Sequence, residues 1–288
     1  MTKMKLVFSA VLAALVLAGP ALGQKLEGTL KKIKTSGTLT IGYRESAPPF
    51  SFMGPDKRPV GYSIDLCIHV AGVVQKQLGL ANLKINWVPV TAENRIQMVV
   101  RRKVDIECST TTASLSRQEQ VDFSLMTFVD GGSLLTTAGA NLRALTDLVG
   151  KRIAVIPGTT TEKALADFLK EESVTVQTVR VKDHAEGLAA LELGLAEAFA
   201  SDRAILIGLT LASKDPTRFF LANFLFSYEP YGLMVSRNDP AFRLAVNRAL
   251  AGLYRSGGVN PIYERWFGPF GKPNEAIQIM YRLNGLPE

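Results

Sequence analysis

The chain has 288 residues, of which 47% are hydrophobic and 20% charged, and its formal net charge is +7. This length is enough for one large domain or two ordinary ones. The basic residues are scattered and are not interleaved with aromatic side chains, so the small positive excess does not indicate a nucleic-acid-binding protein. The two cysteines and two histidines have neither the number nor the spacing of a metal site, and we expect no cofactor.

The N-terminal segment, residues 1–23, has the layout of a secretory signal peptide. Lys3 and Lys5 precede an apolar run from Leu6 to Ala18, and small residues lie just before Gln24. Cleavage there would leave about 265 residues (288 minus 23) and a net charge of +5, because the two lysines are removed. A retained membrane anchor is the alternative, but the apolar run is short for a spanning helix. We therefore expect an exported protein.

The first half of the chain alternates predicted strands and helices. A strand at Leu39–Tyr43 follows a basic helix from about Thr29 to Thr35, and a second strand covers Leu83–Val90. Between these strands, Gly61 precedes a helix that runs to about Leu80. Apolar residues recur in that helix at spacings of three and four, which predicts one buried face. The residues of that face are Ile64, Cys67, Ile68, Ala71, Val74 and Leu78.

A third strand, Val104–Cys108, leads through four consecutive hydroxyl residues into a helix start. Ser116 and Glu119 have the spacing of a capping box, which places Arg117 in the first turn of that helix. Free backbone N–H groups and an arginine at such a point can bind a carboxylate. The alternative is a surface helix whose arginine is only solvated.

Three predicted strands are each followed by a polar segment that contains an arginine, namely Arg44, Arg95 and Arg117. The carboxyl ends of parallel strands lie along one edge of a sheet, where ligands bind in α/β proteins, so the three side chains are expected to converge. Like charges in one cleft repel each other unless an anion joins them. Convergence therefore predicts a ligand with more than one acidic group. Three solvated loop arginines are the alternative.

The second half of the chain forms another α/β unit. A strand at Leu148–Ile156 is followed by a loop rich in glycine and threonine and by a helix from about Glu162 to Lys170. Two further strands, Val174–Val181 and Ala198–Asp202, end close to His184 and at Asp202. The chain then returns as an extended segment, Phe224–Val235, and finishes in helices. Two α/β units joined by two crossings, near residues 128–133 and 226–232, predict two lobes with a cleft between them and hinges at the crossings.

Several polar segments of this chain resemble, in this order, those of periplasmic glutamate/aspartate-binding proteins of polar amino-acid ABC transporters, which are solute-binding proteins of family 3. The segments are GYRESAPPFSF, GYSIDL, TAENRI, the IEC stretch with its threonines, PGTTTE, KDH, FASD and PYG. The resemblance covers about Leu30 to Phe267. It implies the α/β class and the type II periplasmic-binding-protein fold, with lobe 1 at residues 24–130 and 231–288 and lobe 2 at residues 131–230.

The resemblance also implies a function. The chain is expected to be a monomer in the periplasm that is not an enzyme, that captures L-glutamate or L-aspartate by cleft closure, and that delivers it to an inner-membrane permease and its ATPase. The implied ligand contacts divide by ligand group. They are Arg117, Thr110 and Thr112 for the α-carboxylate, Asp202 for the α-ammonium, Arg44, Arg95 and His184 for the side-chain carboxylate, and Thr160 as a hydroxyl from the second lobe.

The sequence departs from the family pattern at a few positions near these residues. Ala92 replaces a serine that lies three residues before Arg95, which removes one hydrogen bond and bears on the choice between glutamate and aspartate. Thr110 stands where serine is usual, and Ser109 stands where glycine is usual. Three arginines and one aspartate give the implied site a formal charge of about +2, which favours an acidic amino acid over its amide, because an amide would leave a buried guanidinium without its anion.

Three alternatives stay open from the sequence. Cys67 and Cys108 either form a disulfide or remain two buried thiols. His184 is either a ligand contact or an ordinary structural histidine. A periplasmic enzyme of the same fold, similar to cyclohexadienyl dehydratase, is the rival function, with His184 and Asp202 available as general acid and base. A sensor domain would need a second membrane segment, which the sequence lacks.

Overall fold

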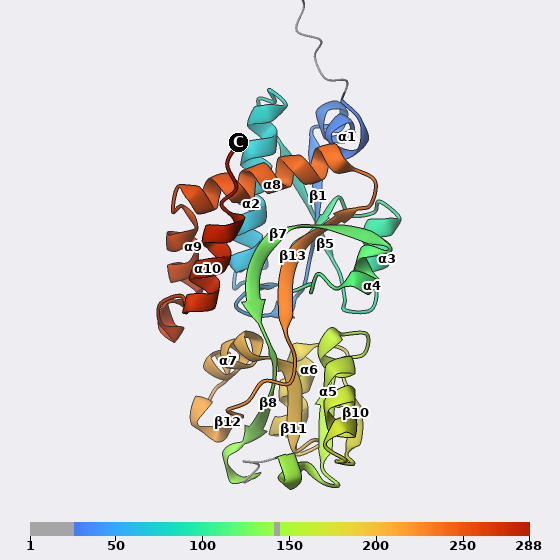
Figure 1. Cartoon of the computed structure of the whole chain (residues 1–288), viewed down its shortest axis with the longest axis vertical. Coiled ribbons are helices and arrows are strands. Elements are labelled where there is room, and N and C mark those ends of the chain that lie inside the picture. The colour runs from blue at the N-terminus through green and yellow to red at the C-terminus, as the bar shows by residue number, and fades with distance from the viewer. Residues whose placement is uncertain (1–25, 141–144) are drawn as a thin grey trace, which may run out of the picture.

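The computed structural model describes residues 26–140 and 145–288. The predicted signal peptide, residues 1–23, lies outside the described residues. Figure 1 shows two lobes stacked along the long axis of the molecule, each with a sheet covered by helices. The first sheet contains β5, β1, β6, β13 and β7 in that order, and the second contains β10, β9, β11, β8 and β12. The fold class predicted from the sequence, two α/β lobes joined by two crossings, is therefore confirmed.

In the upper sheet in Figure 1, β1 lies next to the edge strand β5 and pairs in parallel with β5 and β6, whereas β13 is antiparallel to β6 and β7. In the lower sheet β9 is parallel to β10 and β11, and β8 is antiparallel to β11 and β12. The strands of the two sheets are β1 Thr38–Tyr43, β5 Lys84–Pro89, β6 Ile106–Glu107, β7 Val121–Asp130, β8 Gly132–Thr137, β9 Arg152–Val155, β10 Gln177–Arg180, β11 Ala198–Asp202, β12 Phe219–Leu221 and β13 Glu229–Ser236. A small third sheet contains β2 Ser46–Ala47, β3 Ser51–Met53 and β4 Pro59–Val60.

The helices cover the sheets, and those of the C-terminal part, α8, α9 and α10, lie beside α2 on one side of the upper lobe (Figure 1). No described helix is long and apolar enough to cross a bilayer. The α-helices are α1 Gly28–Ser36, α2 Tyr62–Gln77, α3 Arg95–Val100, α4 Leu115–Gln118, α5 Thr160–Glu171, α6 His184–Glu192, α7 Arg203–Ala212, α8 Pro240–Arg255, α9 Val259–Phe267 and α10 Glu275–Asn284. Short 3-10 helices are η1 Ala138–Ala140, η2 Leu145–Leu148, η3 Pro216–Arg218 and η4 Gly268–Phe270.

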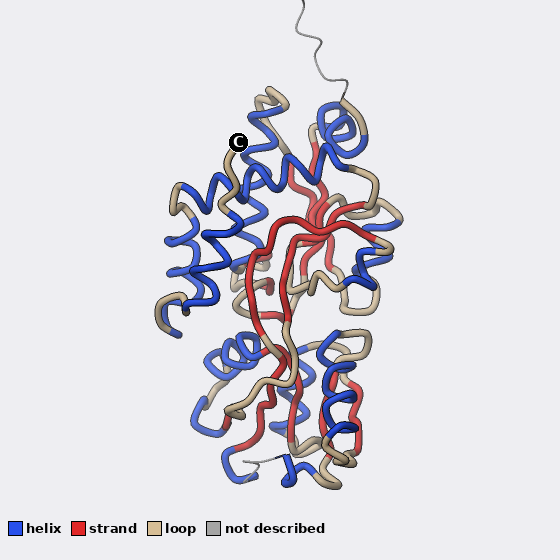
Figure 2. The backbone as a smooth tube through the Cα atoms, in the orientation of Figure 1, coloured by secondary structure: helices blue, strands red, loops and turns tan. Residues whose placement is uncertain are grey.

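Two crossings of the chain connect the lobes, and they lie side by side (Figure 2). In the first, β7 ends at Asp130 and β8 begins at Gly132; in the second, the chain returns into β13 at Glu229. Asp130 and Glu229 are paired in register, so the first residue of the returning strand lies next to the last residue of the outgoing one. We propose that the lobes divide after residues 130 and 230, as predicted from the sequence. The passage of the chain from one sheet to the other near these residues supports this division.

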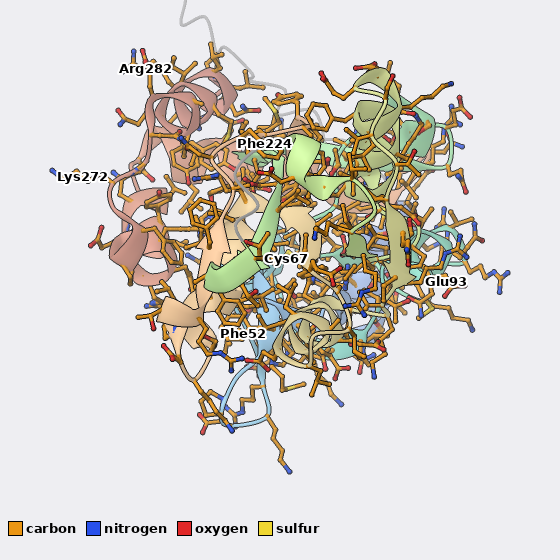
Figure 3. The ribbon with its side chains drawn as sticks, turned by 90° about the horizontal axis from the view of Figure 1, so that it is seen from below. Phe52, Cys67, Glu93, Phe224, Lys272 and Arg282 are labelled. Carbon is orange, nitrogen blue, oxygen red and sulfur yellow. A yellow bond between two sulfur atoms is a disulfide. The ribbon has the colours of Figure 1, made fainter. Side chains whose placement is uncertain are left out.

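The buried face of α2 differs in one position from the predicted face. Ile68 is 47% exposed, whereas Leu66 and Val70 are fully buried. The apolar surface of the helix is therefore rotated toward the side of Leu66 and Val70, and Ile68 lies just beyond its edge. Cys67 lies in this face and forms a disulfide with Cys108, with a Cα–Cα distance of 6.3 Å, which ties α2 to the end of β6 (Figure 3).

An aromatic cluster lies at the base of the upper lobe, next to the crossing strands. Phe50 makes edge contacts with Tyr62, Phe128, Tyr231 and Phe267, at centroid distances of 4.9 to 6.1 Å. Such edge-to-face pairs add to the stabilisation from buried apolar area. Because Phe128 is on β7 and Tyr231 is on β13, the cluster holds both crossing strands against the upper lobe.

Candidate functional site

The three arginines follow the carboxyl ends of three adjacent parallel strands, as the sequence predicted. Arg44 follows β1, Arg95 begins α3 after β5, and Arg117 lies in α4 after β6. Because β1 pairs in parallel with both β5 and β6, their carboxyl ends point to the same edge of the sheet. All three side chains are buried, with exposed fractions of 3%, 3% and 7%. The alternative of three solvated loop arginines is therefore wrong.

The start of α4 differs from the predicted capping box. The N-cap is Ser114, whose Oγ accepts a hydrogen bond from the backbone N–H of Arg117 at 3.3 Å, and Ser116 lies inside the helix. A serine at either position can cap a helix start, so both spacings fit the capping preference. Arg117 nevertheless lies in the first turn, as predicted.

A small cavity with a free volume of about 20 Å³ lies between the lobes. Arg44, Arg95 and Thr110 line it from the first lobe, and Asp202 and His184 line it from the second. The other lining residues, all in the second lobe, are Ile156, Thr159, Thr160, Thr161, Ala200 and Ser201.

The arginine side chains that line the cavity carry unpaired donors. Arg44 Nη2 and Arg95 Nε are buried and have no hydrogen-bond partner among the described residues. Burial, and then the positive charge of Arg95, lowers the pKa of Arg44 to about 10. Burial and Arg95 also lower the pKa of Arg117 to about 10. Buried guanidinium groups that repel each other and keep free N–H donors are suited to bind an anion.

Glu107, at the end of β6, partly offsets this positive charge. The side chain is fully buried, and Arg95, Arg44 and Arg117 all act on its carboxylate. Burial raises the pKa of Glu107, although these arginines and the hydroxyl of Thr111, which donates to Oε2 at 2.8 Å, oppose that shift. Three guanidinium groups and this one carboxylate carry a formal charge of about +2 (three minus one), so this cluster attracts an anion.

Arg117 lies beside the cavity without lining it. Its Nη1 donates to the Thr112 carbonyl oxygen at 3.0 Å and its Nη2 to the Gly158 carbonyl oxygen at 3.5 Å, and Gly158 belongs to the other lobe. Arg95 Nη1 donates to the Thr110 carbonyl oxygen at 3.4 Å, and both residues belong to the first lobe. Ala92 is buried but contributes to a separate groove at the surface, beside Glu93, which points outward at the edge of the molecule in Figure 3.

Asp202 is the acidic group of the cavity, which it lines from the second lobe. Its Oδ1 accepts a hydrogen bond from the Thr161 hydroxyl at 2.6 Å, and its Oδ2 accepts one from the Tyr231 hydroxyl. Burial, and then the charge of Glu229, raises the pKa of Asp202 to about 6. Asp130 lies behind it, and burial raises the pKa of Asp130 to about 8. A buried carboxylate with negative neighbours is suited to accept hydrogen bonds from an ammonium group.

His184 begins α6 and is buried between the lobes. Its pKa is held well below its usual range, first by burial and then by Arg44 and Arg95, so the ring is neutral at pH 7. The ring makes a hydrogen bond with the backbone of Ser46 in the first lobe, and Nδ1 has no partner among the described residues. His184 therefore lies near Arg44 and Arg95, as the family resemblance implied.

The two threonines that the sequence analysis assigned to different lobes meet across the cleft. Thr112 Oγ1 and Thr160 Oγ1 are 3.1 Å apart. Both hydroxyls donate to Glu229 Oε2, and the distance from Thr160 Oγ1 to Oε2 is 2.6 Å. The structure thus brings all eight predicted ligand-binding residues around one interlobe region, with Arg117 and Thr112 just outside the cavity wall.

Sequence reasoning missed three carboxylates that lie near the site. Glu107, Asp130 and Glu229 are each next to the ends of strands, but the sequence alone shows no partner for them. The only available signal was their position at strand ends, because Glu107 precedes Cys108 directly and Glu229 lies in the second predicted crossing. No group of three or more histidine, cysteine, aspartate or glutamate side chains within the described ranges could hold a metal ion.

Comparison with known proteins gives a consistent result. The chain is 41% identical over 263 residues to an L-glutamate/L-aspartate-binding protein of Pseudomonas aeruginosa, covering 91% of this chain and 87% of that protein. It is 34% identical over 262 residues to a glutamate/aspartate import solute-binding protein of Escherichia coli, covering 91% and 85%. The crystal structure of an ancestral amino-acid-binding protein, a precursor of cyclohexadienyl dehydratase, matches with a TM-score of 0.71 and 26% identity over 84% of this chain and all of that one.

A family model matches residues 39–269, which is most of the chain. The structural neighbours share the predicted type II periplasmic-binding-protein fold, and the curated relatives named above are binding proteins and not enzymes. The chain therefore belongs to the bacterial extracellular solute-binding proteins of family 3.

Proposed function

We propose that this protein is the receptor of an amino-acid ABC transporter and that it captures L-glutamate or L-aspartate between its lobes. Its partners are an inner-membrane permease and the ATPase of that transporter. The named relatives at 41% and 34% identity support the acidic ligand and the transport role. In this proposal the chain works in the periplasm as a monomer, after removal of residues 1–23.

The observation that carries the proposal is the polarity of the cavity. Arg44 and Arg95, with unpartnered guanidinium donors, and the Asp202 carboxylate all line this cavity. An acidic amino acid has two carboxylates and one ammonium group, and its carboxylates are the anions that these guanidinium groups can bind. A neutral side chain would leave one buried guanidinium without an anion, which costs about 2 to 5 kcal/mol in comparable truncated pairs.

We assign the residues to ligand groups on this basis. Arg117 and Thr110 bind the α-carboxylate, and Asp202 accepts from the α-ammonium group. Arg44 and Arg95 bind the side-chain carboxylate, with His184 alongside. Thr112 and Thr160 contribute hydroxyl groups from the two lobes.

Cleft closure is the step that signals to the permease in this proposal. Contacts between the lobes, such as Arg117 with the Gly158 carbonyl oxygen and His184 with the backbone of Ser46, exist only when the cleft is shut. A ligand held by both lobes selects the closed state because it gains its second set of contacts there. The crossings near residues 128–133 and 226–232 are the hinges.

Native mass spectrometry of protein purified from cells without dialysis tests this proposal directly. We expect a bound molecule with the mass of glutamate or aspartate, and calorimetry on the protein after ligand removal should reproduce that binding. A different bound mass, or no heat with either amino acid, would overturn it. The rival enzyme, a dehydratase acting on a cyclic dicarboxylate, is disfavoured because the named relatives are binding proteins.

A further inference from the structure

Asp202 occupies the N-cap position of α7 but does not cap that helix. An aspartate at this position usually accepts a hydrogen bond from a backbone N–H of the first helical turn. The Asp202 carboxylate makes no such bond. It accepts instead from the hydroxyls of Thr161 and Tyr231, and it lines the interlobe cavity. The N–H groups in the first turn of α7 therefore need other acceptors, because they have no partner within the helix.

The crossing strand supplies these acceptors. The Arg203 backbone N–H donates to the Gly131 carbonyl oxygen at 2.9 Å, and the Ala204 backbone N–H donates to Asp130 Oδ2 at 3.0 Å. Asp130 Oδ1 accepts from the Gly131 backbone N–H at 2.9 Å, which holds the carboxyl group in this orientation. In Figure 1, α7 lies at the upper edge of the lower lobe, beside the crossing. Asp130 thus caps α7 from β7, at a sequence separation of 74.

The other two helices that begin at the cavity show the ordinary arrangement. The N-cap of α6 is Asp183, whose Oδ1 accepts from the Glu186 backbone N–H at 2.9 Å. The N-cap of α5 is Thr159, whose hydroxyl accepts from the Glu162 backbone N–H at 3.0 Å. Of these three helices, α7 takes its cap from another segment. An aspartate at the start of α6 thus serves its own helix, whereas Asp202 does not.

The cap from Asp130 leaves the Asp202 carboxylate free to act in the cavity. A carboxylate that caps its own helix turns toward the helix and accepts from the backbone there. Because Asp130 already accepts from the Ala204 N–H, Asp202 keeps this acceptor capacity for a ligand. Each carboxylate oxygen can accept about two hydrogen bonds, and Thr161 and Tyr231 use one on each oxygen. The cap does not depend on the charge of Asp130, because a protonated carboxyl group also has an acceptor oxygen.

We propose that Asp130 is a positioning residue for ligand binding: by capping α7 from the crossing strand, it leaves the Asp202 carboxylate free to bind the ammonium group of the ligand. This inference rests on the proposed function, which assigns Asp202 to that group. Asp130 is the last residue of β7. The cap therefore also connects the proposed hinge to the residue that holds the amine.

Replacing Asp130 with alanine removes the cap and tests the inference. The Ala204 N–H then lacks its acceptor, and the Asp202 carboxylate turns toward it, as N-cap residues do. Calorimetry should show glutamate binding at least about tenfold more weakly, because a hydrogen bond to the charged ammonium group is lost. Glutarate, which is glutamate without its amine, should keep its affinity, measured by displacement of glutamate where it is weak. The ratio of the two affinities should therefore fall by the same factor.

The substitution Asp130→Asn separates the cap from the charge. Asparagine caps helices as well as aspartate does and keeps one acceptor oxygen for the Ala204 N–H. The ratio should therefore stay close to that of the unmodified protein. A loss of ratio as large as in Asp130→Ala would overturn the inference, because the acceptor would then not be what matters. An unchanged ratio in Asp130→Ala would also overturn it, since a purely structural residue affects both ligands alike.

Asn274→Ala is the matched control for the loss of a helix cap. Asn274 Oδ1 accepts from the Ile277 backbone N–H at 3.0 Å at the start of α10, in the upper lobe. Its replacement should lower stability and leave both affinities unchanged. If Asp130→Ala does not fold, Asp130→Leu keeps the branched shape of the side chain without an acceptor and should give the same loss of ratio.

The two proposals fail in different ways. If the unmodified protein binds neither glutamate nor aspartate, the proposed function fails, and this inference fails with it. If the unmodified protein binds glutamate and the variants keep its ratio to glutarate, only this inference fails.

Discussion

Replacing Arg44 with glutamine should make the ligand-free protein more stable and its ligand binding weaker. The side chain is 3% exposed, and its Nη2 has no hydrogen-bond partner among the described residues. Burial, followed by Arg95, lowers its pKa from 12.5 to about 10. A fall of this size corresponds to about 3 kcal/mol against the charged form in the folded protein. The guanidinium is thus held at a cost in stability that a bound carboxylate offsets.

In the same Arg44→Gln protein, the free energy of unfolding and the glutamate affinity should change in opposite directions. Chemical denaturation without ligand should show a free energy of unfolding that is unchanged or up to about 3 kcal/mol higher. Calorimetry should show glutamate affinity lowered by about 2 to 5 kcal/mol, the range for a buried charge pair that loses one partner. Arg101→Gln, on an exposed arginine at the end of α3, should change neither quantity.

The reasoning would be refuted if Arg44→Gln lowered the stability of the ligand-free protein and left glutamate affinity intact. That pattern would mean that Arg44 serves the fold and not the ligand. The backbone N–H of residue 44 bonds to Ser51 Oγ at 2.9 Å, and the substitution leaves this contact unchanged. A loss of stability therefore could not be assigned to that contact.

Three further predictions concern the crossing, the disulfide and the closed cleft. Burial raises the pKa of Asp130 to about 8, so near neutral pH the folded protein binds a proton that the unfolded chain does not. The free energy of unfolding should therefore rise as the pH falls from about 9 to 7, by at most about 1.4 kcal/mol per pH unit. Denaturation of Asp130→Asn at a series of pH values should show no such slope. The bond between Cys67 and Cys108 closes a loop with a sequence separation of 41, so replacing both with alanine should lower the free energy of unfolding by about 4 kcal/mol, whereas an unchanged midpoint would contradict this. A Cβ at Gly208 would lie 2.6 Å from the Pro48 carbonyl oxygen of the other lobe, so Gly208→Ala should disfavour closure, and small-angle scattering with saturating glutamate should give a larger radius of gyration than for the unmodified protein.

The sequence predicted the arginines of the site because their placement depends on local order. Each arginine follows a strand that is readable from its apolar run, and parallel strands place their ends together. Arg44, Arg95 and Arg117 therefore converge without any knowledge of side-chain contacts. The cap of α4 was misplaced from Ser114 to Ser116 because both serines satisfy the same local preference, and only the packing of the chain selects one.

The hydrogen-bond partners of the acidic residues could not be predicted in the same way because they come from distant parts of the chain. Glu229 meets Thr112 and Thr160 only after the two lobes have closed on the crossing strands, at sequence separations of 117 and 69. These hydrogen bonds thus depend on tertiary contacts that no local pattern records. β7 and α10 were missed as well, the first because its burial follows no simple alternation and the second because the family resemblance is weakest there.

The central claim, that buried guanidinium groups select a second carboxylate on the ligand, is tested most directly by titrating the ligand-free protein with glutamate and with glutamine. The two ligands have nearly the same shape and differ in one charge. We expect glutamine to bind at least about 30-fold more weakly, which corresponds to the lower limit of about 2 kcal/mol for an unpaired buried charge. Equal affinities for glutamate and glutamine would contradict the account.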